Sequence, residues 1–126
     1  MNRKFNPEGM NPPPFYSHGV EVQAGSRMVF VSGQVGMRPD GSVAEGIGEQ
    51  ATVAIANLTA VLAAGGMTPE DIVKTTIYLT DEADFEGFTG AAAPLLVQPP
   101  AAVTLVYVKA LASPALRVEI EAIAAK

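Results

Sequence analysis

The carboxy-terminal segment carries the pattern with the clearest chemical meaning. Arg117, Glu119 and Glu121 alternate there with the apolar residues Val118 and Ile120. Because side chains alternate across a strand, both carboxylates are expected on one face, within reach of each other's charge. Such a pair can raise the pKa of one carboxyl, which then moves protons for a bound water. A solvated strand face has the same alternation, and spacing alone favours that simpler interpretation.

Two segments distant from this strand also carry polar groups. Ser32 and Gly33 stand where an apolar strand ends, which fits a small polar pocket as well as an ordinary strand end. Tyr16 can pack its ring on a ligand and donate a hydrogen bond from its hydroxyl. Ser17 and His18 are neighbours in an extended segment, so their side chains point apart and do not form a nucleophile and base pair. We expect a structural role for His18.

Residue counts exclude several kinds of site. The chain has 126 residues and a mass of 13.1 kDa, and contains no cysteine. This excludes disulfides, thiolate zinc sites and a cysteine nucleophile, and leads us to expect a cytoplasmic protein. A single histidine is too few for a conventional catalytic zinc site. No lysine or helix start follows Gly33 and Gly36 at phosphate-loop spacing, so these glycines do not form a phosphate-binding loop. From these counts and this spacing together, we expect neither a metal nor a cofactor.

The charge balance bears on partners. Eight basic and thirteen acidic residues give a net charge of -5, so the chain lacks the positive surface of a nucleic-acid binder. The amino terminus starts with basic residues, but no apolar stretch follows them. No apolar run looks long enough to span a bilayer, and we expect neither a secretory signal nor a membrane partner.

Apolar periodicity predicts both helices and strands. Residues 49–64 place apolar side chains on one helical face, and Gly65 and Gly66 end this helix. Residues 68–71 resemble a capped turn, and Asp81 is expected to cap a second, weaker helix. Strand signals fall at residues 20–22, 28–32, 72–79, 101–110 and 116–124, the first two joined as a hairpin through residues 24–27.

This order of elements predicts one α+β domain over residues 1–126, with a sheet that has its helices on one face. The other face of such a sheet stays open. Apolar residues make up 48% of this small chain, so we expect the open face to pack on another subunit. An oligomer is therefore the natural inference.

Five segments resemble the Rid/YjgF family in order and spacing. They are VFVSGQ at residues 29–34, the helix segment at residues 49–66 that ends in NLTAVLAAGG, DIVKTTIYLTDEADF at residues 71–85, Pro-Ala at residues 100–101, and VEIEAIA at residues 118–124. The resemblance implies a chorismate-mutase-like α+β subunit, with a mixed sheet and two helices on one face. It also implies a homotrimer whose sheets face a central barrel and whose subunits form three clefts. Many members hydrolyse imines or enamines released by pyridoxal-phosphate enzymes, giving a 2-oxo acid and ammonia.

The resemblance also implies roles for particular residues. Tyr16, Ser32 and Gly33 match positions that line the family's cleft, and Glu119 matches the glutamate thought to hold the attacking water. Thr89 is the nearest match to an asparagine of the family's second helix, which is lost here.

One family position departs from the pattern. Deaminating members read Pro-Ala-Arg-Ser or similar at the start of the penultimate strand, and the arginine binds the substrate carboxylate. This chain reads Pro-Ala-Ala-Val-Thr at residues 100–104, so Ala102 replaces the arginine, and Ala102 and Thr104 line the site. Losing such a contact at a buried site costs about 2–5 kcal/mol. Arg117 is expected on the Glu119 face, where it more simply pairs with the glutamates, and Lys109 faces the opposite side.

Two functions of different kinds stay open, and whether the chain is an enzyme stays open with them. The first is hydrolysis of a small imine, enamine or related carbonyl compound without a carboxylate at the usual place, and without ordinary 2-imino acid deamination. The second is a metabolite-binding or assembly module without catalysis. Ribonuclease action, attributed to some relatives, is disfavoured because an acidic chain has little means of holding a phosphate backbone.

Overall fold

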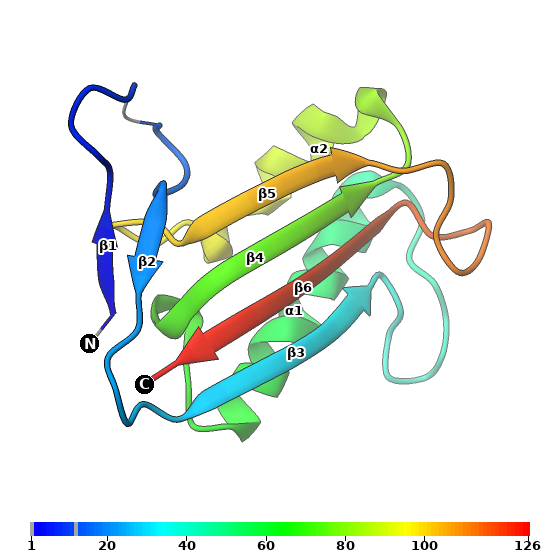
Figure 1. The fold of residues 1–126 in the computed structure, drawn as a ribbon. Coiled ribbons are helices and arrows are strands. Elements are labelled where there is room, and N and C mark those ends of the chain that lie inside the picture. The colour runs from blue at the N-terminus through cyan, green and yellow to red at the C-terminus, as the bar shows by residue number, and fades with distance from the viewer. Residues whose placement is uncertain (1, 12) are drawn as a thin grey trace.

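The computed structural model describes residues 2–11 and 13–126, and shows a mixed four-stranded sheet at the centre of an α+β fold. Its strands, in spatial order, are β3 (Met28–Val35), β6 (Val118–Ala125), β4 (Ile72–Leu79) and β5 (Ala102–Tyr107) (Figure 1). β4 and β5 run parallel, whereas β6 is antiparallel to both of its neighbours. The mixed sheet predicted from the sequence is confirmed.

Two helices cover one face of this sheet. They are α1 (Ile47–Ala64) and α2 (Phe85–Ala91), and both lie behind the sheet in Figure 1. Short 3-10 turns at Pro69–Asp71, Glu82–Asp84 and Ala93–Leu95 lead into or out of these elements. The Asp81 side chain accepts a hydrogen bond from the Ala83 N–H at 2.9 Å, so it caps the 3-10 turn that leads into α2 and not, as was expected, α2 itself. In the part of the chain that the structure describes, no helix lies on the opposite face of the sheet, here called the open face.

The core lies between α1 and the sheet. Ala51, Ala54, Leu58 and Leu62 follow the helical period and are completely buried. Burying each leucine contributes about 1.5–3 kcal/mol relative to leaving it in water. The helix ends where expected, since the Gly65 N–H donates to the Leu62 carbonyl at 2.9 Å.

The expectation that no apolar run is long enough to span a bilayer is wrong for helix α1. Its 18 residues are apolar enough, with a mean hydropathy of 1.3, to cross a bilayer by length and composition alone. The core helix of a globular domain meets the same criteria, and the buried side of α1 packs in the core that includes Val31 and Ile120 of the sheet.

The predicted hairpin between residues 20–22 and 28–32 is wrong. β2 (Gly19–Glu21) pairs instead with β1 (Arg3–Phe5) in a separate two-stranded sheet, and β3 pairs with β6. The residue before β3 is paired with the C-terminal residue of the chain, because Arg27 and Lys126 exchange backbone hydrogen bonds at 2.9 and 3.0 Å. Strand periodicity identifies which segments are strands but not which strands pair. The partner of β2 is β1 and the partner of β3 is β6, and neither partner adjoins its strand in the sequence.

Candidate functional site

The Glu119 carboxylate lies directly over the backbone of Gly33, on the open face. Glu119 pairs in register with Val35 of β3 and Tyr78 of β4. β3 bulges between Val31 and Gln34, so the bulge carries Ser32 and Gly33 out of regular pairing beside this carboxylate. A Cβ atom on Gly33 would stand 1.8 Å from Glu119 Oε2. Glycine at this position therefore lets the carboxylate approach the strand.

The second carboxylate of the pair has a partner of its own. The Tyr78 hydroxyl donates a hydrogen bond to Glu121 Oε1. This bond raises the pKa of Tyr78, and burial and the charges of Glu121 and Glu119 raise it further. Within residues 2–11 and 13–126, no side chain or backbone N–H donates to the Glu119 carboxylate. Both carboxylates share the open face as the alternation predicts, and of the two only the Glu119 carboxylate has no hydrogen-bond donor in the described part of the chain.

The other predicted ligand residues lie toward the opposite end of the sheet. Ala102 pairs with Lys74, four residues before Tyr78 on β4, which is about 13 Å along the strand. Tyr16 lies at the start of β5, because the next residue, Ser17, donates to the carbonyls of Ala101 at 2.9 Å and Pro100 at 2.5 Å. One chain therefore brings Ser32, Gly33 and Glu119 together, and separately brings Tyr16 near Ala102.

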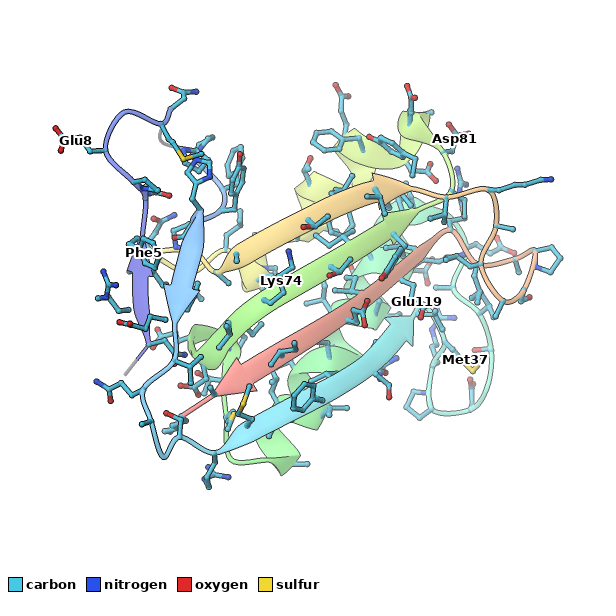
Figure 2. The ribbon with its side chains drawn as sticks, viewed as in Figure 1. Phe5, Glu8, Met37, Lys74, Asp81 and Glu119 are labelled. Carbon is cyan, nitrogen blue, oxygen red and sulfur yellow. The ribbon has the colours of Figure 1, made fainter. Side chains whose placement is uncertain are left out.

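Sequence reasoning missed a cation beside Ala102. Lys74 is the register partner of Ala102 on the open face, and its ammonium donates to Thr104 Oγ1 at 2.5 Å. Figure 2 shows Lys74 and Glu119 on the same side of the sheet, on neighbouring strands. Lys74 forms no salt bridge with any residue that the structure describes. The alternation of residues 72–79 placed Lys74 on this face, but only the parallel register of β4 and β5 places it beside Ala102.

Arg117 does not pair with the glutamates, contrary to expectation. Its guanidinium binds Asp84 through two hydrogen bonds, Nε to Oδ2 at 3.0 Å and Nη2 to Oδ1 at 2.6 Å. The Asp84 side chain is 3% exposed, so this carboxylate needs the cation that it holds. Arg117 is thereby occupied at the junction with α2 and does not replace the missing arginine.

Metal binding finds no support in the side chains. In the described part of the chain, no three histidine, aspartate or glutamate residues gather in a group that could hold an ion. The single histidine is engaged elsewhere: His18 packs edge-on against the Tyr16 ring, with ring centroids 5.5 Å apart.

Comparison with known proteins gives a consistent result. A family model described as Endoribonuclease L-PSP matches residues 9–126. Protein DfrA of Myxococcus xanthus is 41% identical over 119 residues, which cover 86% of this chain and 83% of that protein. The 2-iminobutanoate/2-iminopropanoate deaminase of Salmonella typhimurium is 39% identical over 71 residues, covering 56% of this chain and 53% of that enzyme. The latter match spans only about half of the deaminase.

Solved structures share the whole fold. A protein of unknown function from Yersinia pestis, YyfB of the Rid family, has a TM-score of 0.87 and 35% identity, covering 99% of this chain and 98% of that one. TdcF of E. coli, solved with bound serine, has a TM-score of 0.73 and 30% identity, covering 96% and 93%. The predicted fold class is confirmed by both neighbours.

Proposed function

Since this chain belongs to the Rid/YjgF family, we propose that it binds a small imine, enamine or related carbonyl metabolite and hydrolyses it through Glu119. The observation that carries the proposal is the Glu119 carboxylate, seated over Gly33 and free of hydrogen bonds from the described chain. The similarity to 2-iminobutanoate/2-iminopropanoate deaminases and to a relative with bound serine supports a small, polar ligand.

The proposed reaction uses Glu119 as a general base. Its carboxylate accepts a proton from a water molecule while the water oxygen attacks the carbon of the C=N bond. The same proton passes to the nitrogen and gives a carbinolamine. Glu119 then moves the proton of the added hydroxyl to the nitrogen as the C–N bond breaks, so ammonia leaves and a carbonyl compound remains. An imine and one water thus give one carbonyl compound and one ammonia.

Complete clefts require more than one chain in this proposal. Glu119 and Ala102 are separated along β4 in one chain, so a small ligand does not contact both within a single subunit. Phe30 of the open face is 70% exposed, which favours a subunit contact there. We infer a homotrimer of single-domain subunits over residues 1–126, acting in the cytoplasm, with each ligand held between two subunits.

The substrate is not an ordinary 2-imino acid in this proposal. Ala102 offers a methyl group where deaminating relatives offer a planar guanidinium fork. Lys74 lies beside it, but an ammonium is a point charge and does not reproduce bidentate carboxylate binding. Affinity for acidic substrates is therefore expected to be weak.

The test compares two glutamates of one strand face. Imines would be generated from an amino acid by an amino-acid oxidase and from an amine by an amine oxidase, and ammonia release above the uncatalysed rate would be measured. We expect the neutral imine to be hydrolysed, Glu119→Gln to lower the rate about 100-fold or more, and Glu121→Gln to retain most of it. If neither imine is turned over and a bound metabolite is held equally well by Glu119→Gln, the chain is a binding module without catalysis.

A further inference from the structure

A cavity of about 440 Å³, here called the β1 cavity, lies at the end of the sheet where β4 begins and β6 ends. Its walls come from β1, from the 3-10 turn Pro69–Asp71, from residues 97–99 before β5 and from residues 125–126. Figure 1 shows β1 beside this end of the sheet. Glu119 lies six residues before Ala125 on β6, which is about 20 Å along the strand, so the β1 cavity and Glu119 are well separated within one chain.

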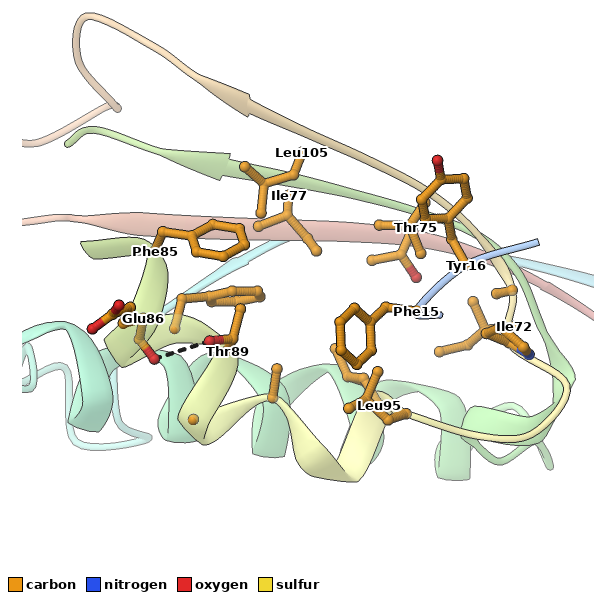
Figure 3. Close-up of a pocket in the computed structure, with 17 residues that line it drawn as sticks. Phe15, Tyr16, Ile72, Thr75, Ile77, Phe85, Glu86, Thr89, Leu95 and Leu105 are labelled. Atoms are coloured by element: carbon orange, nitrogen blue, oxygen red, sulfur yellow. Dashed lines mark hydrogen bonds between the residues drawn. The ribbon is translucent and has the colours of Figure 1, made fainter. Parts of the chain in front are cut away.

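The cavity beside Thr75, which Figure 3 shows, is a different space. It lies between β4, β5 and α2 and has a volume of about 600 Å³. Its lining includes Tyr16, which matches a position of the family's cleft, and Thr89, the nearest match to the family's asparagine. We therefore count it as part of the proposed reaction cleft. None of its lining residues lines the β1 cavity, so the β1 cavity is a separate feature of the fold.

Hydrogen bonds hold β1 against the sheet and fix the walls of the β1 cavity. The Asn2 side-chain amide donates to the carbonyl of Ala125 at 3.1 Å and to that of Asp71 at 3.4 Å. The Lys4 ammonium donates to the Pro99 carbonyl at 2.7 Å. These bonds join β1 to three segments that are distant from it in the sequence, so the walls are fixed without any ligand.

The Lys4 ammonium is the group that points to a ligand carboxylate. It has three N–H donors, and one of them goes to the neutral Pro99 carbonyl. Burial lowers the pKa of Lys4, and the negative charges of Glu70 and Asp71 partly offset this. No carboxylate of the described residues forms a salt bridge with this ammonium. A ligand carboxylate would supply the close counter-charge that the half-buried ammonium lacks.

Glu70 supplies a charge of the opposite sign in the same cavity. Its carboxylate is exposed and accepts no hydrogen bond from the described part of the chain, whereas the Asp71 carboxylate accepts one from the Thr68 N–H at 2.9 Å. Lys4 and Glu70 form no salt bridge with each other, which leaves space for a ligand between them. The charged residues among the described lining are Lys4, Lys126, Glu70 and Asp71, so their charges cancel. A ligand with one positive and one negative group matches this arrangement better than an anion or a cation does.

We propose that the β1 cavity binds a free α-amino acid as its zwitterion, with the ligand carboxylate on Lys4 and the ligand ammonium on Glu70. Val97 and Pro99 line the same cavity and would contact an apolar side chain. The volume falls within the range of about 300–1,000 Å³ that small-molecule sites occupy, so there is room for a side chain as large as that of phenylalanine.

The test uses L-phenylalanine and two compounds that each lack one of its charged groups, 3-phenylpropanoate without the ammonium and 2-phenylethylamine without the carboxylate. Isothermal titration calorimetry should show saturable binding of phenylalanine and binding about tenfold weaker or more for the other two, because each loses a hydrogen bond between charged groups. Lys4→Met and Glu70→Gln should each weaken phenylalanine binding by about the same factor. Lys109→Met and Glu82→Gln are the matched controls, since both residues are exposed and neither lines the cavity, and they should leave binding unchanged.

Glu119→Gln separates this site from the proposed reaction cleft. Phenylalanine binding should be unchanged in this variant, because Glu119 does not line the β1 cavity. Binding that is lost in Glu119→Gln and kept in Lys4→Met would place the amino acid in the reaction cleft and overturn the proposal.

Three other results would overturn it as well: no saturable binding of phenylalanine, equal affinities for the three compounds, or equal affinities of Lys4→Met and Lys109→Met for phenylalanine. Circular dichroism checks that each variant is folded, and Glu70→Gln, at an exposed position, decides the result if Lys4→Met does not fold. None of these measurements needs imine turnover, so amino-acid binding and imine hydrolysis can fail separately.

Discussion

Glu119 Oε2 occupies the space in which Gly33 would carry a Cβ atom, at 1.8 Å from its position. The contact involves the far end of a flexible side chain, and the φ angle of Gly33 is not in the left-handed region. A larger residue at position 33 would therefore displace the carboxylate rather than distort the backbone. This gives a way to move the proposed base without removing it.

Gly33→Ala should lower imine hydrolysis at least tenfold while changing the free energy of unfolding by less than about 1 kcal/mol. Steady-state rates and urea denaturation would measure the two effects. Gly48→Ala is the control, because a Cβ there meets no atom within 4 Å. Unchanged hydrolysis by Gly33→Ala would show that the position of the Glu119 carboxylate does not matter.

Ala102→Arg should raise hydrolysis of 2-iminopropanoate about tenfold or more, because it restores a guanidinium fork where the carboxylate is expected. Ala102→Met adds similar length without charge and should give no gain. The ratio of rates for acidic and neutral imines is the measurement. If the unmodified chain already prefers the acidic imine and Lys74→Met abolishes that preference, Lys74 is the carboxylate-binding residue instead.

Phe30→Asp should dissociate the proposed trimer, since it places a charge on the most exposed apolar side chain of the open face. Sedimentation equilibrium should give three times the 13.1 kDa chain mass for the unmodified protein and one chain mass for the variant. Val61→Asp, on the exposed side of α1, is the control and should leave the trimer intact. A monomeric unmodified chain would contradict the intersubunit cleft.

Arg117→Ala should reduce the free energy of unfolding by about 2–3 kcal/mol, because it leaves the buried Asp84 carboxylate without its cation. The value is below that of a fully buried pair, since the Arg117 side chain is 43% exposed. Arg3→Ala, which breaks an exposed pair with Glu21, should cost less than about 0.5 kcal/mol. Equal losses in the two variants, measured by urea denaturation, would contradict the buried role of Asp84.

Tyr78 should ionise at higher pH than an ordinary tyrosine, because its hydroxyl donates to Glu121 and phenolate would face two carboxylates. A pKa raised in the folded state stabilises the fold at pH values below the unfolded tyrosine pKa of about 10, and this contribution is lost as the pH rises through the folded pKa. Absorbance at alkaline pH follows the ionisation. Glu121→Gln should lower the Tyr78 midpoint, and Tyr107→Phe should not.

The sequence predicted the bounds of the helices and strands better than it predicted which of them lie side by side in the fold. The helical period of α1 and the alternation of β4 come from residues close in the chain, so these two elements were placed almost to their ends. The pairing of β3 with β6 joins distant segments, and the local turn chemistry near Gly25 wrongly indicated a hairpin.

The same distinction holds for the candidate site. Alternation put Glu119 and Glu121 on one face, which is a local property of a strand. The contacts between Arg117 and Asp84 and the neighbouring positions of Lys74 and Ala102 depend on how separate elements pack, and no local pattern encodes them. The cavity beside Thr75 has the same origin, because its walls come from β4, β5 and the segments around α2.

At its bulge, β3 holds one residue more than the stretch of β6 with which it pairs. Between Val31 and Gln34, β3 advances three residues while β6 advances two, from Ala122 to Ile120. The extra residue reverses the in-and-out phase, and it allows Phe30 and Val35 to share a face although they are five apart. A gene that lost one codon here would encode a β3 that pairs regularly with β6 on both sides of the deletion, and it would lose only the irregular backbone of Ser32 and Gly33, over which the Glu119 carboxylate lies.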